Sequence, residues 1–163
     1  MGERWEINQT TAASSDELFE STVWLDAHLP GPPLHVHPSS EERIEVVEGS
    51  LEVFRGGEWT TLAAGEAAVI SAGAPHTFRN SSEAQSKIVI RVAPAGRSEE
   101  FFRCMQALIR DGKVKRLPPK DPRSAIYAAM LFDAYPDWTR AIGPVNRVFK
   151  AMALIGKAIR FEL

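Results

Sequence analysis

Three of the four histidines in this chain, with a glutamate that follows the first two, are candidate ligands for a metal ion. His35 and His37 are two residues apart, and Glu42 follows five residues later. His76 comes from a separate segment, after a Gly-Ala-Pro turn at 73–75. Imidazole nitrogens and a carboxylate suit divalent transition metals, and four such groups rarely converge by accident. The pattern predicts a site for one divalent metal ion, with iron, manganese, nickel, zinc or copper as candidates.

The spacing of these residues indicates how they would face one another. Successive side chains of a strand point to opposite faces, so His35 and His37 would project from the same face. A short turn at 38–41 would bring the chain back and place Glu42 on a neighbouring strand. Glu41 competes with it as the carboxylate ligand, and strand parity would aim only one of the two inward. The alternative is a metal-free interior in which the four polar groups stack together. Nothing would then compensate for the free-energy cost of burying the carboxylate.

The first part of the chain consists of short segments separated by Gly, Pro, Ser and Asn, which is typical of a β-sandwich or barrel. The strands that we expect are Leu18–His28, Leu34–His37, Arg43–Val47, Ser50–Arg55, Glu58–Leu62, Ala67–Ile70, His76–Arg79 and Ser86–Ala93. Gly56 and Gly57 predict a tight hairpin, because they adopt the positive φ angles that two-residue turns need. In the last strand, apolar residues alternate with polar ones except at Val89, which indicates that both faces are partly covered.

The periodicity becomes helical near Ala95. We therefore expect a β-barrel over residues 1–95 and a helical extension over 96–163 that packs on the barrel or on a dimer partner. The expected helices are Glu99–Arg110, Ser124 to about Ala134, and Val145 to about Arg160. The last helix carries cations on one side and an apolar stripe on the other. The stripe is formed by Val145, Val148, Met152, Ile155 and Ile159. The stripe predicts packing on the same domain or on a partner subunit, and a membrane surface is the alternative.

Two spaced motifs in the β region resemble those of the cupin family. The first motif of that family runs His-x-His, three or four residues, Glu, six residues and Gly, and here it reads His35, His37, Glu42 and Gly49. The second runs Gly, five residues, Pro-x-Gly, two residues, His, three residues and Asn, and here it reads Gly65, Ser71, Gly73, His76 and Asn80. Two turn positions depart from the family pattern. Ser71 replaces a proline, and Leu29, with Gly31 nearby, replaces a glycine before the first histidine.

The resemblance implies a mainly β protein with a double-stranded β-helix, or jelly-roll barrel, to which the three C-terminal helices are added. It implies that His35, His37, Glu42 and His76 are the metal ligands, with the spacing to Gly49 favouring Glu42. It also implies a homodimer, because cupins commonly pair through their sheets. We expect that Glu42 could loosen from the metal and serve as a catalytic general base.

Two classes of function fit such a site. By the resemblance, cupins with this ligand set are often dioxygenases, and isomerases and decarboxylases are also known, so a small-molecule metalloenzyme of dioxygenase-like type is expected. Net positive charge in an apolar cavity suits an anionic or enolisable substrate. The alternative is a non-catalytic domain that binds or senses a small ligand. Specificity would depend on which apolar residues point inward, among them Leu18, Trp24, Ile44, Val46, Phe78, Ile88 and Ile90.

The composition argues against other partners. With 163 residues and a formal charge of -2, the chain fits one domain and offers no basic surface for nucleic acid. The single cysteine, Cys104, cannot form an internal disulfide, which fits a reducing, cytoplasmic location, and we interpret it as a small apolar residue on a helix. Neither a secretory signal nor a transmembrane segment is predicted. His28 lies outside both motifs, and we interpret it as a histidine at the barrel rim, with a proton shuttle as the alternative.

Overall fold

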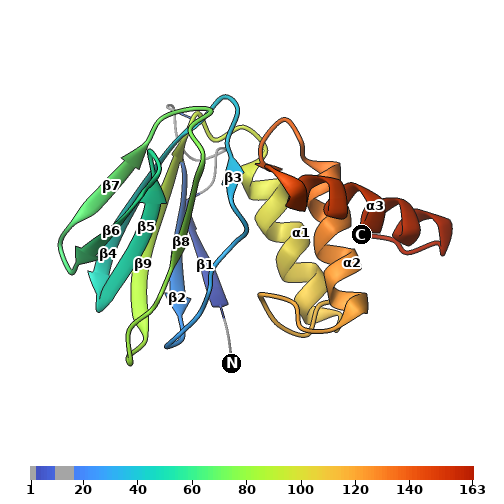
Figure 1. Cartoon of the computed structure of the whole chain (residues 1–163), viewed down its shortest axis with the longest axis horizontal. Helices are drawn as coiled ribbons and strands as arrows, with labels where there is room; N and C mark the ends of the chain where they lie inside the picture. Colours follow the sequence, from blue (N-terminus) through green and yellow to red (C-terminus); the bar gives the residue numbers. More distant parts are fainter. Residues whose placement is uncertain (1–2, 10–16) are drawn as a thin grey trace.

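The computed structural model describes residues 3–9 and 17–163, with the strands on one side and the helices on the other (Figure 1). The strands are β1 Glu3–Gln9, β2 Phe19–Leu25, β3 His35–Val36, β4 Glu41–Glu48, β5 Ser50–Arg55, β6 Glu58–Ala63, β7 Ala67–Ile70, β8 His76–Arg79, β9 Ser86–Ala93 and β10 Arg140–Ala141. The helices are α1 Ser98–Arg110, α2 Pro122–Ala134 and α3 Pro144–Ala158. The expected mainly β fold followed by three helices is therefore confirmed.

Two antiparallel sheets of five strands each form the β region. Their strand orders are β1-β2-β9-β4-β7 and β10-β3-β8-β5-β6. Phe19 and Ile88 from the first sheet and Leu51 and Val53 from the second are at most 1% exposed and belong to one apolar cluster. The two sheets consequently pack face to face, and the barrel core lies between them.

The strand predictions agree with the structure except at the ends of some strands and at two additional strands. β1 was not expected, because its apolar alternation is limited to Trp5 and Ile7. β10 has only two residues and forms by pairing with β3, from which it is distant in sequence. The hairpin at Gly56 and Gly57 is confirmed, with φ angles of 61° and 90°. Both faces of β9 are covered to some degree, since Lys87, Val89 and Arg91 on its outward face are half-buried.

The helices cover the side of the barrel that β1 and β3 border (Figure 1). A second apolar cluster joins α1 and α2, and half-buried Trp5 and Phe102 pack against both this cluster and the barrel core. The Phe102 ring stacks on that of Phe19, with ring centroids 5.0 Å apart. Half-buried Cys104 packs in the helical cluster, as its interpretation as a small apolar residue requires. The apolar core is thus continuous from the barrel into the helices.

The last helix, α3, packs on α2 through small residues. Ala153 is 1% exposed, and a Cβ on Gly156 would overlap the side chain of Met130. Val148 and Ile155, by contrast, are 53% and 52% exposed. These positions do not pack on the rest of the described chain, because the small residues form the closer helix contact. Packing of the apolar stripe on a partner subunit stays a prediction. Within the described part of the chain, no helix has the length and apolar character needed to cross a membrane.

Candidate metal centre

Four buried side chains meet between the two sheets, and they are the four that the sequence singled out. One ligand atom from each of His35, His37, Glu42 and His76 lies within 4.8 Å of the others. The histidines are at most 6% exposed and Glu42 is 5% exposed. This group could hold a metal ion.

Strand pairing brings the histidines together. His35 of β3 lies directly opposite His76 of β8 in the antiparallel register, and their ring centroids are 4.2 Å apart. His37 follows two residues after His35 on the same face. The backbone N–H of Gly73 donates to the His37 carbonyl at 2.7 Å, which ties the turn before His76 to the first motif.

The carboxylate comes from the opposite sheet. Along β4, burial alternates strictly at the start of the strand, so Glu42 is buried and Glu41 is exposed. One Glu42 oxygen, Oε2, lies 2.9 Å from His76 Nε2, and the other, Oε1, lies 3.7 Å from His37 Nε2. The centre therefore bridges the two sheets across the barrel interior.

Backbone carbonyls fix the orientation of all three imidazole rings. The Nδ1 atoms of His35, His37 and His76 each lie 2.9 Å from a carbonyl oxygen, of Pro33, Trp138 and Ala74 respectively. A carbonyl can only accept, so each Nδ1 carries a proton and donates it. In a neutral imidazole this leaves the lone pair on Nε2. Such hydrogen bonds orient and hold metal-ligating histidines.

The unsatisfied groups at this centre also fit a cation. Glu42 Oε2 and His76 Nε2 are fully buried, and neither makes a hydrogen bond. Because they are 2.9 Å apart, their contact is close but lacks hydrogen-bond direction. Two ligands on opposite sides of one ion, each at about 2.1 Å, would be about 4.2 Å apart, close to the spread of the four groups. The donor set therefore fits a transition-metal ion.

The electrostatics of the cluster favour the neutral form of His35 and the ionised form of Glu42. Burial and the neighbouring imidazoles lower the pKa of His35 to about 3. Burial acts to raise the pKa of Glu42, but its contacts with His37 and His76 outweigh burial and hold the pKa below the usual value. For His76, burial acts to lower the pKa, and the contact with Glu42 outweighs it and raises the pKa. Neutral His35 and ionised Glu42 are the forms that bind cations.

The helical extension reaches the centre, which sequence analysis did not anticipate. Trp138 follows α2, and its carbonyl accepts the hydrogen bond from His37 Nδ1. Its ring lies 4.7 Å from the His37 ring between centroids, and β10 then pairs with β3, where Ala141 faces His35. A backbone carbonyl leaves no side-chain signature, so this contact had no signal in the sequence.

A cavity of about 270 Å³ adjoins the cluster and extends under the helices. His35, His37 and Glu42 line one part of it, and its wall is otherwise mainly apolar. Of the apolar residues proposed to set specificity, only Phe78 and Ile90 line this cavity. Ile44, Val46 and Ile88 are instead packed in the barrel core.

Glu3, in β1, is a second carboxyl group that lines the cavity. It is half-buried, and its Oε1 accepts a hydrogen bond from Trp5 Nε1 at 2.9 Å. Burial outweighs that hydrogen bond and raises the pKa of Glu3 to about 7. Sequence analysis did not single out this residue.

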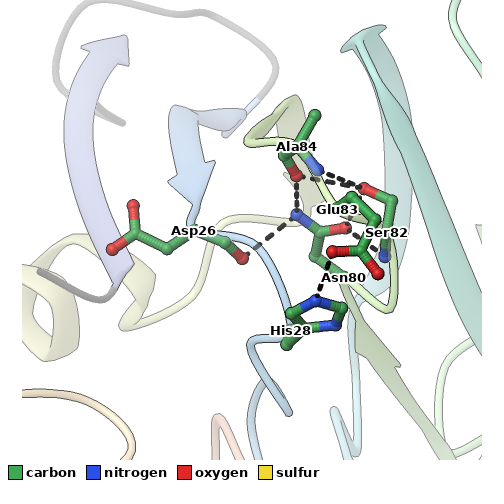
Figure 2. A network of polar contacts seen from close by, with 6 residues as sticks. All are labelled: Asp26, His28, Asn80, Ser82, Glu83 and Ala84. Carbon is green, nitrogen blue, oxygen red and sulfur yellow. Dashed lines mark hydrogen bonds and ion pairs between the residues drawn. The ribbon is translucent and has the colours of Figure 1, made fainter.

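The asparagine of the second motif has a structural role (Figure 2). Asn80 is 1% exposed, and its Nδ2 donates to the carbonyls of Leu25, Asp26 and Ala84, while its Oδ1 accepts from Ser82. It therefore holds the turn between β8 and β9 against the end of β2.

His28 lies beside this turn and is not among the clustered ligands. Its exposed side chain lies 3.0 Å from Glu83 Oε2. The structure therefore places His28 on the surface, as expected for a histidine at the rim.

Gly31 compensates for one departure from the family pattern. It has φ +65°, and a Cβ there would overlap the carbonyl oxygen of Phe78. Pro32 accepts a hydrogen bond from Thr77 Oγ1 at 2.7 Å, which fixes the same loop beside His76. The family pattern expects a glycine at position 29, whereas this loop requires its glycine two residues later, at Gly31.

Comparison with known proteins agrees with this architecture. Residues 25–91 match the Cupin domain family. These residues therefore form a cupin domain. It is 36% identical over 87 residues to Quercetin 2,3-dioxygenase of Bacillus subtilis (strain 168), an alignment that covers 50% of this chain. The alignment spans only 26% of that relative's own length.

Two solved structures show similarity over the cupin region. The TT1209 protein of Thermus thermophilus is 28% identical with a TM-score of 0.51, covering 57% of this chain and 84% of that chain. A conserved protein with a double-stranded β-helix domain from Klebsiella pneumoniae subsp. pneumoniae is 22% identical with a TM-score of 0.51. That match covers 58% of this chain and 79% of the other. The expected double-stranded β-helix is confirmed.

Proposed function

We propose that this cupin binds one divalent transition-metal ion through His35, His37, Glu42 and His76 and is a metal-dependent, dioxygenase-like enzyme. The observation that carries the proposal is the shared orientation of the three imidazoles, whose Nδ1 atoms all donate to carbonyls. The ion would supply Lewis-acid or redox chemistry to an anionic or enolisable oxygen ligand. Likeness to a quercetin 2,3-dioxygenase over half of the chain supports this reaction class.

The residues of the chain would bind, orient and shield the substrate. His35, His37 and Glu42 line the cavity, so a ligand held there would contact the centre directly. The apolar wall would exclude water and strengthen electrostatic contacts with the ligand. Glu42, which already contacts both His37 and His76, is the group that could accept a proton from an enolisable carbon.

Oxygen uptake by metal-loaded protein tests this function. The metal-free chain is loaded in turn with Fe²⁺, Mn²⁺, Ni²⁺, Cu²⁺ or Zn²⁺, and oxygen consumption is recorded with flavonols and with 1,3-diketones. At least one redox-active metal should support consumption, and Glu42→Gln should reduce it, whereas Glu41→Gln, on the exposed neighbour, should not. Ligand binding without oxygen uptake under every metal would contradict the dioxygenase and favour a binding or sensing protein, or an isomerase or decarboxylase.

A further inference from the structure

The C-terminal helices and the segments between them supply more than half of the residues that line the cavity beside the metal centre. Barrel residues such as Phe78 and Ile90 supply the rest of the lining. The aromatic side chains on the helical side come from all three helices and the α2–β10 connection and are Phe101, Phe102, Phe132, Trp138 and Phe149. This helical wall lies outside residues 25–91, the part of the chain that matches the cupin family.

Trp138 connects the two parts of the cavity. Its ring is 4.7 Å from that of His37 and 4.6 Å from that of Phe101, between centroids. The aromatic wall is therefore in direct contact with the metal centre. A ligand bound at the centre has an aromatic surface beside it along which a flat, apolar group can pack.

An unsatisfied donor in this wall points independently to a ligand. Trp138 is 6% exposed, and its indole Nε1 is buried without a hydrogen-bond partner. Leaving a buried donor unpaired is costly, and such a group calls for an explanation. Because Trp138 lines the cavity, an oxygen atom of a ligand bound there could accept a hydrogen bond from this N–H.

We propose that this chamber binds the aromatic body of an elongated ligand whose enolisable oxygen end faces His35, His37 and Glu42, so that the helical extension selects the substrate. The ligand class is an enolisable diketone or a similar oxygen chelator that carries aryl groups. The chelating end rests on the proposed metal site, whereas the aryl preference rests on the helical wall alone.

Two ligands with the same chelating end separate these contributions. Acetylacetone and dibenzoylmethane are both 1,3-diketones, but only the second carries phenyl groups. Their binding to Zn²⁺-loaded protein, which is redox-inert, is measured by calorimetric titration. Burial of the phenyl groups should make dibenzoylmethane bind about a hundredfold more tightly, since each ring contributes substantial apolar area.

Matched variants locate the aryl groups. Ala125 of α2 lines the cavity, so Ala125→Phe should fill it and remove most of the preference for dibenzoylmethane. Ala151 of α3 is exposed, and Ala151→Phe should keep the preference. Acetylacetone and Zn²⁺ should bind all three proteins equally. Trp138→Phe, which keeps an aromatic ring but removes the indole N–H, should weaken dibenzoylmethane binding several-fold more than acetylacetone binding.

The outcomes distinguish this inference from the proposed function. Equal affinity for the two diketones in the unaltered protein, or an undiminished preference in folded Ala125→Phe, overturns the chamber. If the preference for dibenzoylmethane persists in metal-free protein and Zn²⁺ adds nothing to either affinity, the chamber stands and the metal-dependent function fails.

Discussion

The loop before the first histidine should be unusually intolerant of a single added methyl group. Gly31 and Gly56 have nearly the same positive φ angle, +65° and +61°, but differ in their surroundings. A Cβ on Gly31 would overlap the Phe78 carbonyl, whereas a Cβ on Gly56 has no atom within 4 Å. Placing alanine in the left-handed region costs about 1–2 kcal/mol at either position. Gly31→Ala adds an overpacking cost of about 1–3 kcal/mol, because backbone must move.

Thermal unfolding of the metal-free protein measures this difference. For a chain of this size, about 1 kcal/mol shifts Tm by about 2–4 °C. We expect Gly31→Ala to lower Tm by about 10 °C and Gly56→Ala by about 4 °C. Since the same loop carries the Pro33 carbonyl that orients His35, Gly31→Ala should also weaken metal binding about tenfold, and Gly56→Ala should not. Equal Tm shifts in the two variants would refute the reasoning.

Two further predictions concern Glu3 and the last helix. The folded-state pKa of Glu3 is raised from 4.5 to about 7, so its contribution to stability is full below pH 4.5 and is lost as pH rises to 7. As pH rises through that window, Glu3→Gln should therefore become more stable relative to the unaltered protein. The gain in unfolding free energy should be at most about 3 kcal/mol, because the side chain is only half-buried. Chemical denaturation at pH 4.5 and pH 8 measures this gain, and a stability difference that does not change with pH would contradict the prediction. Deletion of residues 145–163 removes nearly all of α3 and exposes the part of α2, at Ile126 and Met130, on which Gly156 packs. The deletion should therefore cause aggregation or a change in oligomeric state. An unchanged elution volume and Tm would show that α3 is dispensable.

The sequence predicted the elements whose signals are local. Turn residues and the alternation of apolar and polar residues located the strands from β2 to β9. The motif spacing to Gly49 selected Glu42, and strand parity then predicted that Glu41 points outward, as the burial along β4 shows. Helical periodicity located three helices, but it did not determine which face of α3 meets α2. There, Ala153 and Gly156 allow close packing and leave Val148 exposed.

The features that were missed depend on contacts between distant parts of the chain. The hydrogen bond from His37 to Trp138 joins residues 101 positions apart through a backbone carbonyl. The helical wall of the cavity likewise forms only when the helices close over the barrel. Motif spacing could indicate candidate ligands, but it contained no information about what lies beside them.

The most direct test of the metal centre is the metal content per chain after equilibrium dialysis against Zn²⁺, in the unaltered protein and two histidine variants. His37 is buried in the cluster. His28, by contrast, is exposed, and its side chain pairs with Glu83 on a surface turn. We predict one ion per chain in the unaltered protein and in His28→Ala, and a sharp loss in folded His37→Ala. Full retention of the ion in His37→Ala, or equal loss in both variants, would contradict the central claim.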